Sequence, residues 1–202
     1  MLLSNNKIEC ISYTLKDANI KYFPNLFNKT IADLYFNYLL KNTAWNQDKI
    51  KIFGELVNLP RLTMWYGDPK KSYTYSGIKM ESLPCSKELI QIRTVVEEVS
   101  ENFFNSVLLN RYRNGNDSVS WHTDNEKELG KFITIGSVSF GQARDFQLKH
   151  KDNNKLNKLT ISLKHGSLLL MNHPTQLNRL HRVPKRNNVF GDRINLTFRK
   201  IL

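Results

Sequence analysis

Cysteine is scarce in this sequence, which has only Cys10 and Cys85 among its 202 residues. Two cysteines cannot supply the several disulfide bridges that hold small secreted domains together, and they cannot form a cysteine-based zinc motif. We therefore expect both side chains to be ordinary buried thiols. The lack of a disulfide framework favours a reducing, intracellular compartment, which is the cytoplasm in a bacterium and the nucleus in a eukaryote.

Long apolar runs are missing as well. The longest strongly apolar runs, such as Leu168 to Met171, are far shorter than the ~20 residues that a helix needs to cross a bilayer. At the N-terminus, Met1-Leu2-Leu3 leads directly into the polar residues 4–7, so the apolar region of a secretory signal is not evident. Both observations argue against a membrane protein and against secretion.

Acidic residues are outnumbered by basic ones. The chain has 30 lysines and arginines but 18 aspartates and glutamates, which gives a formal net charge of +12. Such a charge attracts polyanions, and nucleic acid is a better candidate than an anionic membrane. Short basic clusters could contact phosphates, although any single one is more often a solvated face: Lys70-Lys71, Arg111 to Arg113, Lys149 to Lys151 and Lys185-Arg186.

Two histidines and one aspartate form the most informative pattern that is present. In an extended segment, residues i and i+2 project to the same side, so His122 and Asp124 can reach one metal ion together. His181, far along the chain, could complete a triad that holds one face of Fe(II) and leaves positions open for a cosubstrate and dioxygen. The tripeptide alone is a weak signal, because it occurs often by chance. The complete triad predicts oxidative chemistry.

The segment Arg193 to Arg199 alternates polar and apolar residues, as in a half-buried strand. The apolar residues would face the core, and the polar residues would share the other face: Arg193, Asn195, Thr197 and Arg199. Two arginines on one face are costly to desolvate unless they meet a carboxylate, which a guanidinium binds through two parallel hydrogen bonds. An exposed edge strand with solvated arginines is the simpler interpretation of this segment alone. Beside the triad, 2-oxoglutarate becomes the natural ligand.

These residues belong to a longer series of motifs between about Phe53 and Leu202. In chain order the motifs are Phe53-Gly54, Pro60-Arg61, Tyr66-Gly67-Asp68, Tyr73-Thr74-Tyr75-Ser76-Gly77, Asn110-Arg111-Tyr112, His122-Thr123-Asp124, Ser137-Val138-Ser139-Phe140-Gly141, Arg144-Asp145-Phe146, His165-Gly166-Ser167-Leu168, Met171-Asn172-His173-Pro174-Thr175, His181 and Arg193 to Leu202. Together they resemble the AlkB-type Fe(II)/2-oxoglutarate dioxygenases, and most closely the members that repair alkylated duplex DNA.

The resemblance implies a cofactor set and the residues that bind it. Iron would be held by His122, Asp124 and His181, with 2-oxoglutarate and O2 as cosubstrates. The implied contacts of 2-oxoglutarate are Asn110, Tyr112, Arg193, Asn195 and Arg199. The implied reaction is oxidative demethylation of N-alkylated bases in DNA, of the 1-methyladenine and 3-methylcytosine type, with release of formaldehyde and succinate.

The resemblance also implies how a damaged base is recognised. Tyr73 and Tyr75 are i and i+2, so they share one face, and this segment lines the base pocket in the family. Phe53 falls where the duplex-acting members present an apolar wedge that fills the gap left by a flipped nucleotide. Further substrate contacts are expected from Arg61, Asn125 and Glu126. Asn125 replaces an acidic residue of those members that contacts the cationic methylated base, which leaves Glu126 to supply the charge.

Periodicity along the chain predicts an α+β fold. After a strand-like lead-in over residues 1–22, apolar stripes predict helices at about 29–41, capped by Asn28, and from Ser86 to about Ser100. Short apolar or alternating runs then predict strands: Val107 to Tyr112, Ile133 to Phe140, Phe146 to Lys149, Leu159 to Leu163, Leu168 to Met171 and Arg193 to Arg199. This spacing is typical of a double-stranded β-helix (jelly roll), which the resemblance also implies, braced here by N-terminal helices.

The length of the chain fits one domain. We expect a single dioxygenase domain over residues 1–202 that acts as a monomer. Its helical and nucleotide-recognition part would occupy about 1–104, and its jelly-roll catalytic core about 105–202.

Other functions stay open at this point. The same enzyme could act on RNA or single-stranded nucleic acid, because a flipped base looks similar in each. A non-catalytic basic nucleic-acid-binding module with a structural metal is less favoured, because structural zinc prefers a closed site of four ligands rich in cysteine. Of the remaining histidines, His150 is expected to face phosphate or solvent, and His165 and His173 to be structural.

Overall fold

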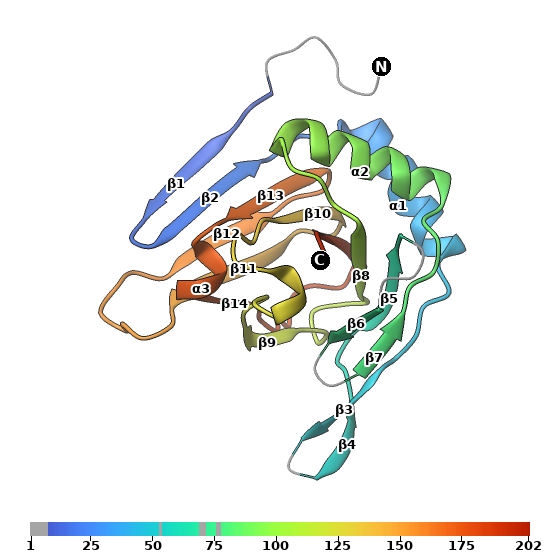
Figure 1. Cartoon of the computed structure of the whole chain (residues 1–202). Helices are drawn as coiled ribbons and strands as arrows, with labels where there is room; N and C mark the ends of the chain where they lie inside the picture. The colour runs from blue at the N-terminus through green and yellow to red at the C-terminus, as the bar shows by residue number, and fades with distance from the viewer. Residues whose placement is uncertain (1–7, 53, 69–71, 76–77) are drawn as a thin grey trace.

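The computed structural model of the protein describes residues 8–52, 54–68, 72–75 and 78–202. Two antiparallel sheets face each other, and the two long helices, α1 and α2, pack against the outer face of the larger sheet (Figure 1). The helices are α1 (Lys29–Asn42), α2 (Lys87–Ser100) and α3 (Thr175–Asn178), with one turn of 3-10 helix at Lys127–Leu129.

The larger sheet has seven strands in the order β1-β2-β13-β10-β15-β8-β5. In that order they are β1 (Ile11–Leu15), β2 (Ala18–Phe23), β13 (Ser167–Asn172), β10 (Ile135–Gly141), β15 (Arg193–Arg199), β8 (Ser106–Tyr112) and β5 (Leu62–Gly67). All neighbours pair antiparallel. The sheet therefore includes three strands, β1, β2 and β5, from the part of the chain that precedes the expected core.

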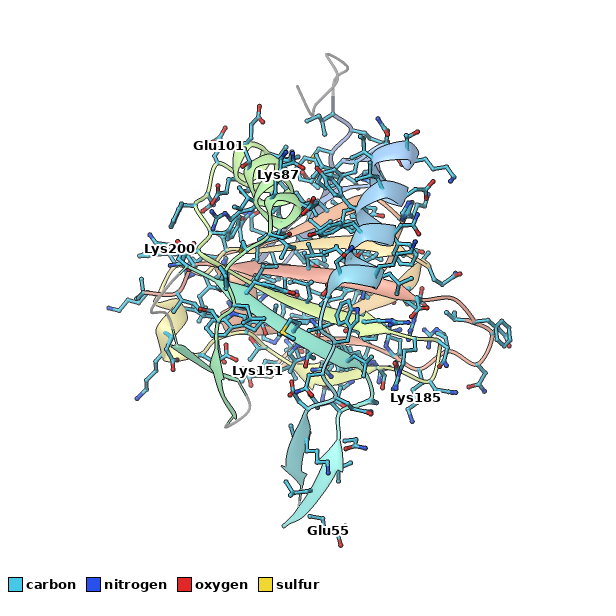
Figure 2. The ribbon with its side chains drawn as sticks, turned by 90° about the vertical axis from the view of Figure 1, so that its right-hand side faces the viewer. Glu55, Lys87, Glu101, Lys151, Lys185 and Lys200 are labelled. Atoms are coloured by element: carbon cyan, nitrogen blue, oxygen red, sulfur yellow. The ribbon has the colours of Figure 1, made fainter. Side chains whose placement is uncertain are left out.

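The smaller sheet has four strands in the order β12-β11-β14-β9. In that order they are β12 (Leu159–Leu163), β11 (Arg144–His150), β14 (Arg179–Val183) and β9 (Val119–His122). Two hairpins lie outside both sheets: β3 (Lys49–Ile52) with β4 (Glu55–Asn58), and β6 (Ser72–Tyr75) with β7 (Ile78–Glu81). The β3–β4 hairpin projects from the body of the molecule, with Glu55 at its outer end (Figure 2).

Both predicted helix caps are present. The side chain of Asn28 accepts a hydrogen bond from the Ile31 amide at 3.0 Å, and that of Ser86 accepts one from the Leu89 amide at 3.3 Å. Each cap satisfies an amide at the start of a helix that has no partner within the helix. The predicted boundaries of α1 and α2 are thereby confirmed to within one residue at each end.

Alternation along the strands separates two apolar layers. In β13, Leu168 and Leu170 pack with the helices, whereas Leu169 and Met171 pack into the layer between the two sheets. The apolar residues of β15 join the helix-side layer: Ile194, Leu196 and Phe198. The polar residues of β15 consequently face the space between the sheets, which is the arrangement that the alternating pattern predicted.

The expected fold class, an α+β fold with a jelly-roll core braced by N-terminal helices, is confirmed. The strand boundaries differ slightly, since β10 begins at Ile135 and β11 at Arg144. Cys85 is half-buried, but the expectation of a buried thiol is wrong for Cys10, which is exposed just before the edge strand β1. Within the described ranges, no helix is both long enough and apolar enough to cross a membrane.

Candidate active site

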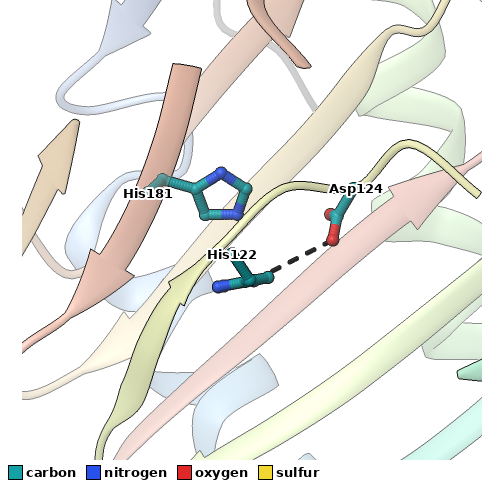
Figure 3. Close-up of side chains that lie close together, drawn as sticks. All are labelled: His122, Asp124 and His181. Atoms are coloured by element: carbon teal, nitrogen blue, oxygen red, sulfur yellow. Dashed lines mark ion pairs between the residues drawn. The ribbon is translucent and has the colours of Figure 1, made fainter. Parts of the chain in front are cut away.

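Three side chains between the sheets form a cluster that could hold a metal ion. The ligand atoms of His122, Asp124 and His181 all lie within 4.8 Å of one another. His122 ends β9 and pairs directly with His181 of the neighbouring strand β14, and Figure 3 shows the Asp124 carboxylate beside them. Nε2 of His122 lies 3.9 Å from Oδ1 of Asp124. The structure thus brings together the triad that the sequence predicted.

A ligating nitrogen must be unprotonated, and hydrogen bonding orients one imidazole of the cluster while burial keeps the other neutral. Nδ1 of His122 donates to the carbonyl oxygen of Ser120 at 2.8 Å, so Nε2 is the nitrogen of this ring that is directed toward the cluster. Burial lowers the pKa of His181 to about 3, so its ring is neutral at neutral pH. The Phe146 ring stacks on the His181 ring, with the ring centroids 5.2 Å apart.

One oxygen of the Asp124 carboxylate accepts hydrogen bonds, and the other has no donor among the described residues. Arg199 donates to Oδ2, whereas Oδ1 is buried and accepts no hydrogen bond from any described residue. Burial acts to raise the pKa of this carboxyl, but the Arg199 charge, together with the two histidines, holds the pKa well below its ordinary value. An ionised, buried oxygen without a donor calls for a cation. The donor set therefore fits a divalent metal.

Gln176 links the segment of Thr123 and Asp124 to the strand that carries His181, and no sequence pattern predicted it. Its side-chain oxygen accepts the Asp124 amide at 3.0 Å, and its backbone oxygen accepts the Thr123 hydroxyl. Gln176 is only 1% exposed, and it lies in α3, which leads directly into the strand that carries His181. The contact is long-range and a single glutamine carries no motif, so the sequence holds no local signal for it.

Arg193 is a buried cation that lines the same cavity as the triad. It is 1% exposed, its Nη2 donates to the Ser139 hydroxyl at 2.9 Å, and its guanidinium lies 5.1 Å from the centre of the Tyr112 ring. Nε and Nη1 have no hydrogen-bond partner among the described residues. Burial lowers the pKa of Arg193 to about 10, which leaves it charged at neutral pH. This side chain fits an anionic ligand such as a carboxylate.

Most of the predicted site residues line one cavity between the sheets: Arg61, Asn110, Tyr112, His122, Asp124, His181, Arg193, Asn195 and Arg199. Arg61 Nε donates to Asn110 Oδ1 at 2.8 Å. The Asn195 side-chain amide donates to the Ser137 hydroxyl at 2.8 Å and to the Val138 carbonyl at 2.9 Å. These bonds fix the orientation of both asparagines toward the cavity.

No described contact tests the remaining predicted residues. Asn125 is exposed and Glu126 is half-buried in the loop that follows Asp124. Tyr73 and Tyr75 lie in β6, where they pair with Met80 and Ile78 of β7. Phe53 lies outside the described residues. Their contacts with a substrate stay predictions.

The other histidines are engaged elsewhere. His165 accepts the Gly141 amide at 2.7 Å and contacts Asp33 at 3.1 Å, as expected for a structural group. Nδ1 of His150 accepts two amides of the following turn, so the expectation that it faces phosphate or solvent is wrong for that nitrogen. The ring centroid of His173 lies 5.1 Å from that of Phe132.

Comparisons with known proteins agree with this geometry. Residues 19–199 match the family described as the 2OG-Fe(II) oxygenase superfamily. The chain is 40% identical to human "DNA oxidative demethylase ALKBH2" (Homo sapiens) over 186 aligned residues. The alignment covers 88% of this chain and 71% of that relative. It is 37% identical to human "Alpha-ketoglutarate-dependent dioxygenase alkB homolog 3" over 193 aligned residues. This alignment covers 91% of this chain and 66% of that relative.

The fold has solved counterparts. The structure described as "The structure of OsALKBH1" superposes with a TM-score of 0.61 at 13% identity, covering 94% of this chain and all of that one. At this identity the likeness supports the fold alone. With the family match and the two human relatives, the chain belongs to the 2OG-Fe(II) oxygenase superfamily and is an AlkB-type Fe(II)/2-oxoglutarate-dependent dioxygenase.

Proposed function

We propose that this dioxygenase is an oxidative DNA demethylase that acts on N-alkylated bases of the 1-methyladenine and 3-methylcytosine type, releasing formaldehyde and succinate. The observation that carries the proposal is that the His122-Asp124-His181 cluster and the buried, incompletely bonded guanidinium of Arg193 line the same cavity. Relatives named DNA oxidative demethylase, from cattle and from Arabidopsis thaliana, support DNA as the substrate, as does the net charge of +12.

In this proposal, Fe(II) would be held by His122, Asp124 and His181, whose ligand atoms lie close together. When bound, the iron supplies, with 2-oxoglutarate and O2, the oxidation of the methyl carbon that then leaves as formaldehyde. Arg199 keeps the Asp124 carboxylate ionised and oriented by holding its other oxygen. Gln176 fixes the backbone of the motif through the amide of Asp124.

Arg193 is proposed to bind a carboxylate of 2-oxoglutarate, with Tyr112 under the guanidinium and with Asn110, Asn195 and Arg199 around the same cavity. Five apolar side chains also line this cavity: Leu108, Val119, Phe146, Met171 and Val183. Such walls exclude bulk water from the ligand, which strengthens the polar contacts made inside.

The substrate side follows from the chemistry of the lesion. A methyl on the Watson-Crick edge breaks pairing, so extruding that nucleotide costs less than extruding a paired one. A second cavity opens between the β3–β4 hairpin and β9, and it is lined by Val57, Arg61 and His122 among others. We assign base contacts to Tyr73, Tyr75, Arg61, Asn125 and Glu126, and the wedge to Phe53.

We propose further that residues 1–202 act as one domain and as a monomer. Up to about residue 104 the chain would recognise the nucleotide, and beyond about 105 it would carry the chemistry. An intracellular location, where DNA and 2-oxoglutarate occur together, follows from this function.

Mass spectrometry of matched oligonucleotides tests the proposal. The Fe(II)-loaded protein is given 2-oxoglutarate and air with duplex DNA, single-stranded DNA or RNA that carries one 1-methyladenine or 3-methylcytosine. We expect loss of one methylene from the DNA lesions, abolished in His122→Ala and retained in the control His150→Ala, whose ring lies outside the cavity. Repair confined to RNA would contradict DNA as substrate. Succinate without repair would reject these lesions, and no succinate would reject the oxygenase assignment.

A further inference from the structure

The outer face of the smaller sheet carries an aromatic ring flanked by two cations. Lys149 Nζ lies 4.9 Å from the centre of the Trp121 ring, and the Arg182 guanidinium carbon lies 4.5 Å from it. The three side chains come from three adjacent strands, β11, β14 and β9. All three are half-buried, so the indole provides one shared surface against which both charged side chains rest.

Alternation explains why this trio faces outward. On β11, Phe146 and Leu148 pack into the layer between the sheets, which directs the intervening Gln147 and the following Lys149 to the other face. On β14, His181 and Val183 are buried in the same way, which directs Arg182 outward. The trio therefore lies on the side of the smaller sheet that is opposite the metal cluster.

Within the described part of the chain, no carboxylate pairs with either cation of the trio, Lys149 or Arg182. Arg182 Nε donates to the neutral side chain of Gln147 at 2.8 Å, which orients the guanidinium without neutralising it. Two cations held over one ring attract the ring but repel each other, so an anion between them would lower the energy of the arrangement.

The position next to the active site indicates which anion fits. Trp121 immediately precedes His122, and it lines the cavity between β9 and the β3–β4 hairpin together with Lys185. A nucleic acid whose base reached His122 through this cavity would have its sugar-phosphate backbone near β9, the edge strand that carries Trp121. Arginine and lysine side chains bind such backbone phosphates. These contacts fix the position of the protein along the nucleic acid and do not read its sequence.

We propose that Trp121, Lys149 and Arg182 form a phosphate clamp, in which the indole holds the two cations ready for a backbone phosphate of the nucleic-acid substrate. The proposal rests on the proposed function for the identity of the substrate. The clamp contributes affinity and register, and it does not touch the reacting atoms. Trp121 is accordingly a positioning residue, which acts through Lys149 and Arg182.

Salt-dependent binding tests the clamp. Anisotropy measures the dissociation constant of the full chain, without iron or 2-oxoglutarate, for a labelled duplex carrying one 1-methyladenine at several NaCl concentrations. Arg182→Gln and Lys149→Gln should each reduce the slope of log Kd against log salt by about one. Lys87→Gln, on α2 and on the other side of the molecule from Lys151 and Lys185 in Figure 2, removes the same charge and should leave the slope unchanged.

The indole is tested by a pair of variants. Trp121→Leu should weaken binding, and Trp121→Phe, which keeps an aromatic face, should retain most of it. Slopes for Arg182→Gln and Lys149→Gln equal to that of Lys87→Gln would overturn the clamp, even if Trp121→Leu does not fold. Repair by the wild-type protein is measured separately. A protein with the expected slopes that repairs nothing would keep the clamp and reject the demethylase function.

Discussion

Arg199 donates two hydrogen bonds to the same oxygen of Asp124, from Nη2 at 2.8 Å and from Nε at 3.3 Å to Oδ2. Both side chains are almost fully buried, with 4% and 2% of their surfaces exposed. Because Oδ2 is occupied in this way, Oδ1 is the oxygen that faces His122. The arginine that the sequence associated with 2-oxoglutarate therefore also orients the acidic member of the triad.

Removing one member of this buried pair should be costly. Arg199→Ala leaves the Asp124 charge buried without its partner, and we expect the metal-free protein to lose about 3–5 kcal/mol of unfolding free energy in urea. The matched control is Arg93→Ala, which breaks a more exposed pair with Asp68 and should cost at most about 1 kcal/mol. Equal losses in the two variants would contradict the role given to Arg199.

Gln176 should act on the metal site from outside it. Gln176→Leu removes the acceptor of the buried Asp124 amide, and we expect the affinity for Mn(II), measured calorimetrically as a redox-stable stand-in for iron, to fall about 10- to 100-fold. Gln147→Leu, on the outer face of the smaller sheet, is the matched control and should bind Mn(II) like the wild type. An unchanged Mn(II) affinity in Gln176→Leu would refute the positioning role.

His181 should make the metal-free protein sensitive to mild acid. The folded state lowers the pKa of His181 from 6.5 to about 3. At a pH between these two values, the His181 side chain binds a proton in the unfolded chain but not in the folded chain. The free energy of unfolding should therefore be highest above pH 6.5 and decline as the pH falls toward 3. His181→Gln should flatten this decline in urea melts at about pH 6.5 to 4. A decline of the same steepness in both proteins would contradict the assignment.

Arg193 should determine the binding of 2-oxoglutarate. A lost charge-assisted hydrogen bond costs about 1.5–3 kcal/mol, so Arg193→Gln should raise the dissociation constant of 2-oxoglutarate for the Mn(II)-loaded protein about 10- to 100-fold. The control is Arg186→Gln, which removes the same charge from an arginine that is more exposed than Arg193 and pairs with Asp145. Mn(II) affinity itself should change little in either variant. Wild-type affinity for 2-oxoglutarate in Arg193→Gln would place the cosubstrate elsewhere.

Phe53 distinguishes duplex from single-stranded substrates. A wedge fills the gap left by a flipped base only where a partner strand exists, so Phe53→Ala should lower repair of duplex DNA far more than repair of a single strand. Initial rates on both substrates, at equal enzyme loading, provide the comparison. Similar losses on the two substrates would remove the wedge assignment and leave the catalytic proposal intact.

The sequence predicted those parts of the site that depend on short-range geometry. The alternation in 193–199 correctly separated an apolar face from a face with two arginines, and the spacing of His122 and Asp124 placed both side chains on one side. Both predictions rest on the two-residue period of extended chain, which is local. His181 was proposed as the third ligand of the triad, but no local period predicts that its strand β14 pairs with β9.

Contacts between distant segments could not be predicted in this way. Gln176 meets Asp124 across 52 positions of the chain, and Arg199 meets Asp124 across 75. The same limit applies to Trp121, whose two cations come from other strands, and to the recruitment of β1, β2 and β5 into the larger sheet. Partners of this kind depend on how strands are ordered in the sheets, which no local period encodes.

The most direct test of the central claim is the stoichiometry of the reaction. The Fe(II)-loaded wild-type protein and Asp124→Asn are incubated with 2-oxoglutarate, O2 and duplex DNA carrying 1-methyladenine, and succinate, formaldehyde and restored adenine are counted together. We predict one succinate and one formaldehyde for each adenine restored by the wild type, and none of the three from Asp124→Asn. Adenine restored without succinate, or by Asp124→Asn at the wild-type rate, would contradict the account.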